Sequence, residues 1–487
     1  MIWLENIVSK PKWLWSILFG SLLLSHLWML HLPPQGEHIW RQCHTSAVAR
    51  NFVKEGMNPF ETRIDARGET NGITGSHFPA FEYSVALISK LTGGYWEGYN
   101  RWFALLCFAL SMLFLYHILR SIWNDPSIAA LGTWCYIWLP INYIYSATAV
   151  PDVLALCAGL GGISMGIQWL ESRRVVFLLL SAVSLLLAGM VKVQFILYGA
   201  PVLMLVALKW NQRTAKERWM FMLSAGLMVL GVVLWYQRAW TLREVSGLRD
   251  FGYPLELPLN WLEYAMSHTK TVFSRFPNSL IGFAFLPIVL VGLYRAFRLW
   301  NSGSDWKWPL VLLSTGFLAY QLVLAEKILG HNYYMLLYTP LVVVLIVIGI
   351  RQMKTRVPIL VVVLLAVAPM NAFFRTQHQW LKPNRNVPAD FFDPAKRAEL
   401  SALFPKGELA IVGQEQSPCI YHYFTHTKGL TIGKEFELEV DSLNALGAKN
   451  YTRLMLRKEL LDEADWKVLK SFEQLDHEGE VVVYRLN

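Results

Sequence analysis

The sequence predicts a polytopic α-helical membrane protein with a small C-terminal α/β domain. The chain has 487 residues, of which 54% are hydrophobic, and its mean hydropathy is +0.34. These values exclude an ordinary soluble domain. Several apolar runs also approach ~20 residues, which is long enough for a helix to cross a hydrocarbon core of ~30 Å. The 21 Trp and 20 Tyr residues suit the two membrane–water interfaces.

Apolar segments divide residues 1–375 into about eleven predicted transmembrane helices. The fifth and sixth are separated only by Val191-Lys192-Val193. No small-residue cleavage site precedes Pro33, so we expect the first apolar segment to remain as a span. The predicted spans are 13–32, 102–123, 127–146, 151–170, 174–190, 194–209, 219–240, 277–298, 308–325, 333–350 and 357–374.

The short loops predict the orientation in the membrane. One set of loops is rich in Lys and Arg, whereas the opposite set contains only Lys192 and Lys327. The positive-inside rule places the basic set in the cytoplasm, so we expect a cytoplasmic N-terminus and a periplasmic C-terminus. The net charge of +9 lies largely in these loops and does not indicate a nucleic-acid partner. The basic set comprises Lys10, Lys12, Arg120, Arg173, Arg174, Lys209, Arg213, Lys216, Arg218, Arg295, Arg298, Lys307, Arg351, Lys354 and Arg356.

The first outer loop, residues 33–100, is unusually long and polar for a connection between two spans. Long ordered loops are typically functional. Helical spacing of apolar residues in Thr45–Lys54 and Ala80–Leu91 predicts two short helices on the membrane surface. The 241–275 loop, with Tyr253-Pro254 and Leu257-Pro258, is predicted to cover a site.

The composition changes after residue 375, and residues 376–487 are predicted to form a periplasmic α/β domain. About 110 residues make a small core, so we expect this domain to depend on contacts with the membrane part for its stability. The predicted strands are Leu409–Val412, Leu430–Ile432 and Val481–Tyr484, and the predicted helices are Asp390–Leu403, Val440–Leu446 and Leu460–Leu475.

Charged residues beside the spans are the candidates for a site on the outer face. Glu37 suits a general base, the alternative being a solvated loop acid. Asp152 suits a second acid, although an acid after Pro151 is also an ordinary helix start. Lys192 suits a contact to a lipid phosphate, the alternative being a lysine that snorkels to the interface.

Further candidates would contact the phosphate or the sugar. Arginine binds phosphate through two parallel hydrogen bonds, which favours Arg41, Arg63 and Arg275. His331 and Tyr334 lie close together in the sequence, in the outer connection between the ninth and tenth predicted spans, where an imidazole and a phenol suit a phosphosugar. The alternatives are that His331 caps the tenth span and that Tyr334 is an interfacial aromatic residue.

One set of segments forms a recognisable pattern: HIWRQCHTSAVARNF, RIDARGETNGITGSHFP, VPDVLAL, Lys192 and HNYY. With these segments the chain resembles the GT-C membrane glycosyltransferases over residues 10–375. The resemblance is closest to the family of protein O-mannosyltransferases and of the aminoarabinose transferase acting on lipid A. The resemblance implies a bacterial inner-membrane enzyme that transfers a sugar, with inversion, from a polyprenyl-phosphate donor to a glycan, lipid or protein acceptor.

The resemblance also implies an acid in the first outer loop that serves as the base or orients the acceptor. Two positions depart from the family pattern, because His44 stands where relatives often carry Asp and His77 where they often carry Glu. The acid role therefore falls to Glu37, Asp65 or Asp152, or else His44 is the base. We expect Glu37, Asp152, Lys192 and His331 to meet in one cavity.

No resident cofactor is expected. A divalent metal held by His38, His44, His77 and His331 is an alternative that their wide spacing disfavours, and the Walker, GxSxG and HExxH motifs are absent from the sequence. Two other functions remain open. One is a transporter or flippase of a lipid-linked or small polar solute, and the other is a non-catalytic binding or assembly protein of the same fold. The lack of a repeated half disfavours the transporter.

Overall fold

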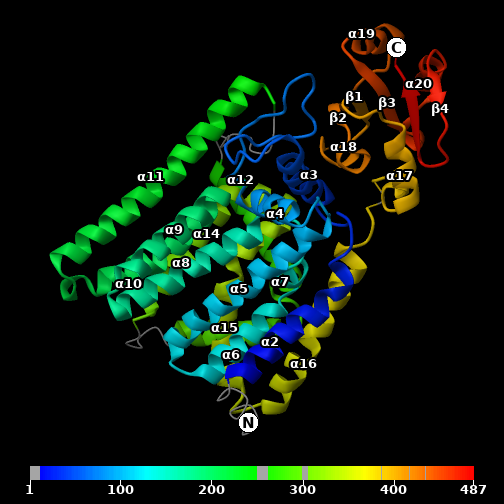
Figure 1. The fold of residues 1–487 in the computed structure, drawn as a ribbon. Helices are drawn as coiled ribbons and strands as arrows, with labels where there is room; N and C mark the ends of the chain where they lie inside the picture. Colours follow the sequence, from blue (N-terminus) through cyan, green and yellow to red (C-terminus); the bar gives the residue numbers. More distant parts are fainter. Residues whose placement is uncertain are drawn as a thin grey trace. The chain divides into compact units, whose positions relative to one another are not determined.

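The computed structural model describes residues 11–248, 261–298, 305–384, 386–415, 417–433 and 435–486 (Figure 1). The chain forms two compact units. Unit 1 comprises Met1–His31, Arg101–Gln237 and Tyr253–Trp380, and unit 2 comprises Leu32–Asn100, Arg238–Gly252 and Leu381–Asn487. The first outer loop therefore groups with the C-terminal segment, whereas the predicted boundary at residue 375 placed it with the membrane part.

Unit 1 is helical, and each of the eleven predicted spans contains α-helix. Six of the described helices are long and apolar enough to cross a membrane. A seventh span is added if the pair Met266–Ile281 and Leu286–Arg298, bent by 115°, counts as one. A count of eleven transmembrane helices thus stays a prediction. The helices are α2 (Pro11–His26), α5 (Gly98–Trp123), α6 (Pro126–Ile137), α7 (Pro140–Tyr145), α8 (Asp152–Ser172), α9 (Val175–Val191), α10 (Gly199–Leu208), α11 (Ala215–Ser246), α12 (Trp261–Arg275), α13 (Leu286–Arg298), α14 (Lys307–Gly330), α15 (Thr339–Met353) and α16 (Pro358–Arg375).

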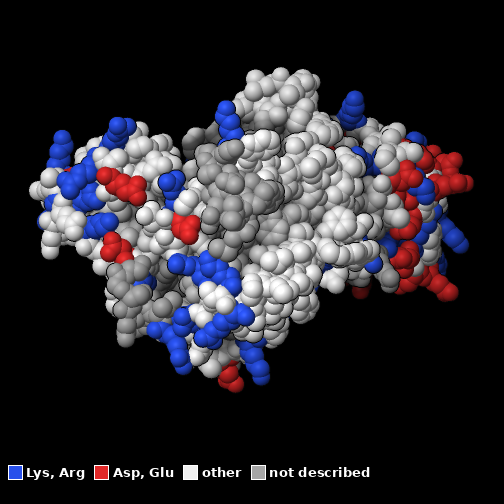
Figure 2. All heavy atoms as spheres, turned by 90° about the horizontal axis from the view of Figure 1, so that it is seen from below, with Lys and Arg blue, Asp and Glu red and all other residues white. Residues whose placement is uncertain are grey.

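The basic loops gather at one end of the helices of unit 1. Figure 2 looks toward this end, and its left and lower parts show many more Lys and Arg than acidic side chains. Aromatic rings accompany some of these cations, since Arg218 lies over Trp210 and Lys307 over Trp308. This pairing of cations and indole rings suits a membrane–water interface. The cytoplasmic assignment of this end remains a prediction.

Two helices of unit 1 are interrupted in the same way. Helix α9 ends at Lys192, whose backbone is extended (φ −150, ψ 110), and the 3₁₀ helix η2 (Val193–Tyr198) follows. Helix α14 ends at His331, whose backbone is likewise non-helical (φ −138, ψ 86), and the 3₁₀ helix η6 (Asn332–Tyr338) follows. Within a membrane, such breaks are tolerated only where the freed backbone is buried in protein or lines a cavity. Both breaks therefore mark positions with a special role.

Unit 2 contains a five-stranded sheet with the strand order β2-β1-β3-β5-β4. The first three strands in this order are parallel, and β5 is antiparallel to both β3 and β4. The strands are β1 (Leu409–Gly413), β2 (Lys428–Ile432), β3 (Tyr451–Arg457), β4 (Glu473–Leu475) and β5 (Val481–Arg485). The three predicted strands are confirmed. The predicted helix Leu460–Leu475 is wrong at its end, because α20 (Glu463–Leu469) stops and β4 follows.

The two faces of the sheet bury separate cores, because neighbouring strand residues point to opposite sides. One core contains Val412 and Met455 of the sheet, together with Ile39 and Cys43 of α3 (Ile39–Glu55). The other contains Leu454 of the sheet with residues of α19 (Val440–Gly447) and α20. The remaining helices are α4 (Ala80–Leu91), α17 (Pro394–Ala402) and α18 (Ile420–Thr425). The shared core explains why the loop and the C-terminal segment form one unit.

Both predicted helices of the first outer loop are present. Helix α4 has the predicted bounds, and α3 begins at Ile39, six residues before the predicted Thr45. Figure 1 shows α3 beside α18, and Arg50 of α3 donates to the carbonyl of Tyr423 in α18, 373 residues further along the chain. Most residues of α3 are buried, so it is a core helix of unit 2. This burial differs from the predicted position on a membrane surface.

Candidate functional site

The carboxylate of Asp152 and the ammonium of Lys192 form an ion pair in unit 1. Asp152 opens α8 and is completely buried, and its Oδ2 lies 3.3 Å from Nζ of Lys192, whose side chain is 13% exposed. Burying a charge costs several kcal/mol unless an opposite charge lies against it. The pair therefore accounts for how an acid and a lysine persist between apolar helices. A buried ion pair at two helix ends is also a common feature of functional sites in membrane proteins.

Aromatic rings surround the same lysine. Nζ of Lys192 lies 5.5 Å from the ring centre of Tyr333 and 5.2 Å from that of Tyr334, within the range of cation–π attraction. His331 stacks on Tyr333 with ring centres 5.6 Å apart. The hydroxyl of Tyr145 donates to Oδ1 of Asn332. The two helix breaks thus bring a cation, an imidazole and two phenol rings together with Asp152.

Arg275 ends α12 and is exposed. Its Nη1 donates to the backbone carbonyl of Leu329 at 2.8 Å, two residues before His331. Four residues predicted for donor binding, Lys192, His331, Tyr334 and Arg275, therefore lie at or beside the two breaks of unit 1.

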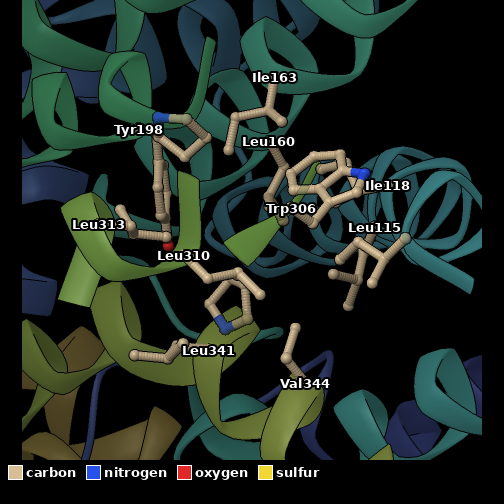
Figure 3. A pocket seen from close by; sticks show the side chains of 13 residues that line it. Leu115, Ile118, Leu160, Ile163, Tyr198, Trp306, Leu310, Leu313, Leu341 and Val344 are labelled. Carbon is tan, nitrogen blue, oxygen red and sulfur yellow. The ribbon is translucent and has the colours of Figure 1, made fainter. Parts of the chain in front are cut away.

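Unit 1 also contains an apolar pocket (Figure 3). Its wall includes Leu115, Ile163, Tyr198, Trp306 and Leu341, and no residue that lines it is charged. Such a lining accepts hydrocarbon but offers nothing to hold a phosphate. Asp152 and Lys192 are not among its lining residues. The ion pair, and not this pocket, therefore supplies charged groups that can bind a phosphate.

Glu37 lies just before α3 in unit 2. Its side chain is 35% exposed, and its Oε1 lies 3.9 Å from Nε2 of His38. His38 has a left-handed backbone (φ 55), an uncommon conformation for a residue with a side chain. The amide of Gln42 donates to the carbonyls of Gln35 and Glu37 at 2.8 and 3.2 Å. The turn that presents Glu37 is therefore held by hydrogen bonds from α3 itself.

Arg41 contacts a histidine outside its own helix, and that histidine contacts a buried carboxylate. Its Nη2 lies 3.3 Å from Nδ1 of His77, and Nε2 of His77 lies 3.0 Å from Oε1 of Glu82. Glu82 is completely buried. Burial raises the pKa of its carboxyl, but the electrostatic attraction of His77, the hydrogen bond from His77 and the charge of Arg41 outweigh this and lower the pKa. Glu82 is thus held as a carboxylate beneath His77.

The other predicted residues of unit 2 have separate surroundings. His44 is buried with Nδ1 3.9 Å from Sγ of Cys419, so it faces the C-terminal segment. Arg63 pairs with Glu61 at 2.5 Å, which balances its charge within the loop. Neither contact involves Arg41 or Glu37. Glu37, Arg41, His44 and Arg63 belong to unit 2, and Asp152, Lys192, His331, Tyr334 and Arg275 belong to unit 1.

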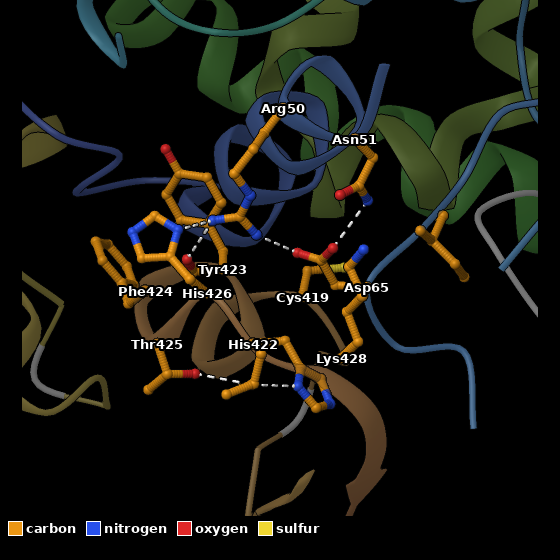
Figure 4. Close-up of polar contacts among 12 residues, drawn as sticks. Arg50, Asn51, Asp65, Cys419, His422, Tyr423, Phe424, Thr425, His426 and Lys428 are labelled. Carbon is orange, nitrogen blue, oxygen red and sulfur yellow. Dashed lines mark hydrogen bonds and ion pairs between the residues drawn. The ribbon is translucent and has the colours of Figure 1, made fainter. Parts of the chain in front are cut away.

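Asp65, the remaining candidate acid, is committed to a buried network (Figure 4). Its carboxylate accepts from Arg50 at 2.5 Å and from Asn51 at 2.8 Å. Arg50 also donates to the carbonyl of Tyr423 and to Nδ1 of His426. Burial raises the pKa of Asp65, but the charge of Arg50 and the hydrogen bond from Asn51 lower it overall. The network joins α3, the first loop and α18, which indicates a structural role for Asp65.

Two residues of these clusters were not among the predicted site residues. Glu82 lies on the buried face of α4 with Phe81, Val85 and Ala86. An acid on the apolar face of an amphipathic helix is the sequence signal that would have found it. Tyr333 completes the aromatic pair around Lys192, and its neighbour Tyr334 was predicted. Within the described part of the chain, no group of three or more His, Cys, Asp or Glu residues could hold a metal ion. Metal dependence stays untested.

Known proteins resemble this chain in part of its sequence and in its fold. The family model of the dolichyl-phosphate-mannose-protein mannosyltransferases matches residues 76–236. No curated protein sequence matches the chain. Among solved structures, ArnT from Cupriavidus metallidurans bound to undecaprenyl phosphate has a TM-score of 0.62 at 12% identity, covering 97% of this chain and 98% of that one.

Two further solved structures have the same architecture. The archaeal oligosaccharyltransferase AglB from Archaeoglobus fulgidus, in complex with an inhibitory peptide and a dolichol-phosphate, has a TM-score of 0.52 at 11% identity and covers 96% of this chain and 73% of its own. The arabinofuranosyltransferase AftD from Mycobacteria has a TM-score of 0.57 at 12% identity and covers 98% of this chain but 41% of its own. The resemblance inferred from the sequence is confirmed, and the chain has the fold of the GT-C glycosyltransferases.

Proposed function

We propose that the protein is an inverting glycosyltransferase. It would move a sugar from a polyprenyl-phosphate donor to a glycan, lipid or protein acceptor at the periplasmic face of a bacterial inner membrane. The observation that carries this proposal is the buried pair of Asp152 and Lys192, set between two broken helices and capped by Tyr333 and Tyr334. The lipid phosphates bound to ArnT and AglB support a lipid-phosphate donor for a chain of the same fold.

Lys192 would hold the donor phosphate. An ammonium carries three N–H donors, and the carboxylate of Asp152 at 3.3 Å fixes one side of it while leaving the other donors to a ligand. The rings of Tyr333 and Tyr334 would contact the apolar face of the sugar. Arg275, His331 and Tyr334 would supply further contacts to the phosphate or the sugar.

The reaction would be a single displacement. The acceptor oxygen attacks the anomeric carbon, the bond from that carbon to the phosphate oxygen breaks, and its electron pair leaves with the polyprenyl phosphate. Lys192 offsets the negative charge that develops on this oxygen. Glu37, or His44 in its place, takes the acceptor proton, and Arg41 is a second phosphate contact. Because the lipid phosphate leaves as a stable anion, this chemistry does not itself require a metal.

A transfer assay tests the proposal. The full-length protein in lipid nanodiscs is incubated with radiolabelled undecaprenyl-phosphate sugars and with lipid A, glycan and peptide acceptors. Transfer of label supports the enzyme. Label that crosses the bilayer of reconstituted vesicles without transfer would show a flippase, and saturable binding with neither activity would show a binding protein; each of these overturns the proposal. Asp152→Ala, expressed at the normal level, is the matched inactive control.

A further inference from the structure

A chain of polar contacts in unit 2 ends on a buried carboxylate that the proposed reaction does not use. It runs from Arg41 on α3 through His77 to Glu82 on α4. Arg41 is 2% exposed and Glu82 is completely buried. The other oxygen of Glu82, Oε2, has no hydrogen-bond partner among the described residues. A buried carboxylate oxygen without a hydrogen-bond partner is energetically costly, which points to a role for the charge of Glu82.

The geometry of His77 decides what the carboxylate does. Nε2 lies against Oε1 of Glu82, an acceptor, so Nε2 carries a proton and donates. Nδ1 lies 3.0 Å from the hydroxyl of Ser76, and Nη2 of Arg41 lies 3.3 Å from Nδ1 and 3.5 Å from Nε2. A guanidinium can only donate, so in a neutral His77 that donates from Nε2 to Glu82, Nδ1 is the nitrogen that can accept from Arg41. The carboxylate thus favours the tautomer whose lone pair on Nδ1 is open to Arg41, as carboxylates do for metal-bound histidines.

We infer that Glu82 and His77 are positioning residues that orient the guanidinium of Arg41 for the donor phosphate. This inference rests on the proposed function, in which Arg41 contacts that phosphate. It adds that binding of the lipid phosphate depends on a carboxylate that does not itself touch the ligand. A guanidinium recognises phosphate through its planar fork, so its orientation matters as much as its charge.

Placement in the fold supports the same role. Glu82 lies in the first turn of α4, where the helix dipole stabilises a carboxylate. Arg41 lies in the first turn of α3, only four residues after the candidate base Glu37. The two helices pack together across their buried faces, with Val48 and Phe52 of α3 against Ala86 of α4. The distance from Glu82 to Arg41 is therefore set by the core of unit 2 and not by mobile side chains.

Binding of undecaprenyl phosphate alone to the full-length protein is the first test. Glu82→Gln keeps the shape of the side chain but removes its charge. We expect it to raise the Kd for undecaprenyl phosphate roughly tenfold, the size of one charge-assisted hydrogen bond. The control is Glu69→Gln, an exposed acid of the same loop, which should leave Kd unchanged. An unchanged Kd in Glu82→Gln overturns the inference.

A double variant separates positioning from general damage to the fold. If Glu82 acts through Arg41, then Glu82→Gln has no further effect on Kd once Arg41 is alanine. An equal loss of affinity in the Arg41→Ala background overturns the inference. In the transfer assay, Glu82→Gln should raise KM for the donor with little change in kcat.

Two further controls make the binding result interpretable. If Glu82→Gln does not fold, His77→Asn, which removes the same link at a less buried position, takes its place with the same expectations. Failure of the wild-type protein in transfer counts against the proposed function. A wild-type protein that transfers sugar with a Glu82→Gln variant that binds normally counts against the present inference alone.

Discussion

The guanidinium of Arg50 lies 2.5 Å from the carboxylate of Asp65, and both side chains are at least 97% buried. Arg50 belongs to α3 in the first outer loop, and it also donates to the carbonyl of Tyr423 in α18. One side chain therefore ties together the two distant parts of the chain that build unit 2. A charge pair without solvent is costly to break, because the remaining partner is left buried and uncompensated.

Asp65→Asn should destabilise unit 2 by about 3–5 kcal/mol, the cost of leaving one buried charge unpaired. Thermal unfolding of the purified full-length protein, with hydrogen exchange in residues 39–55 and 420–425, measures the loss. The matched control is Glu69→Gln, which removes the exposed ion pair with Lys449, because exposed pairs contribute little. Equal stability of the Asp65 and Glu69 variants would show that the buried pair is not structural.

The ion pair of Lys192 and Asp152 predicts how the stability of unit 1 differs between single and double variants. Lys192→Met leaves a buried carboxylate, and Asp152→Asn leaves a largely buried ammonium, so each single change should cost about 3–5 kcal/mol. The double variant is neutral at both positions and should be more stable than either single variant. Transfer activity should be lost in all three. A double variant less stable than both singles would contradict a direct coupling of these charges.

Much of this architecture could be predicted from the sequence, because apolar runs and period-2 patterns report burial directly. Strand β3 was not predicted, because it is buried on both faces toward its end. A central strand of this kind lacks the alternation of apolar and polar residues that marks a half-buried strand. The grouping of the loop with the C-terminal segment also escaped. It depends on a core shared by residues as distant in sequence as Cys43 and Met455, which no local pattern encodes.

The candidate site was predictable where a charge stood alone among apolar residues. Lys192 and Asp152 were conspicuous for that reason, and the structure pairs them. Glu82 was missed, although it stands at helical spacing with Val85 and Ala86 on the buried face of α4. Arg63 was predicted to contact the phosphate, but it forms an ion pair with its neighbour Glu61. Side-chain pairing across helices decides such cases, and spacing along the chain does not report it.

The identity of the base can be read from kinetics. A general base contributes about 10²–10⁴-fold to the rate, so Glu37→Gln should lower kcat by that range with KM for the donor little changed. His44→Gln should have a smaller effect, because His44 is buried beside Cys419. Single-turnover transfer measures both rates. A larger loss of kcat in the His44 variant would move the base from Glu37 to His44.

Glu415 predicts how the stability of unit 2 depends on pH. Burial raises the pKa of its carboxyl from 4.5 to about 7, although the backbone N–H groups of Tyr421, Ile420 and Cys419 and the hydroxyl of Ser417 oppose the rise. A carboxyl with a raised pKa in the folded state stabilises the fold below its ordinary pKa. That contribution is lost as pH rises through about 7. The loss amounts to roughly 3 kcal/mol at about 1.4 kcal/mol per pKa unit.

His422 and His426 act in the opposite direction. Burial lowers the pKa of His422 to about 4 and that of His426 to about 3, so their contribution is lost as pH falls below 6.5. Comparison of Glu415→Gln with the wild-type protein isolates the carboxyl, because both proteins keep the two histidines. Between pH 5 and pH 8, the stability of the wild-type protein should rise less than that of the variant in chemical unfolding. Equal changes would mean that Glu415 titrates normally and that its cradle of N–H donors fully offsets its burial.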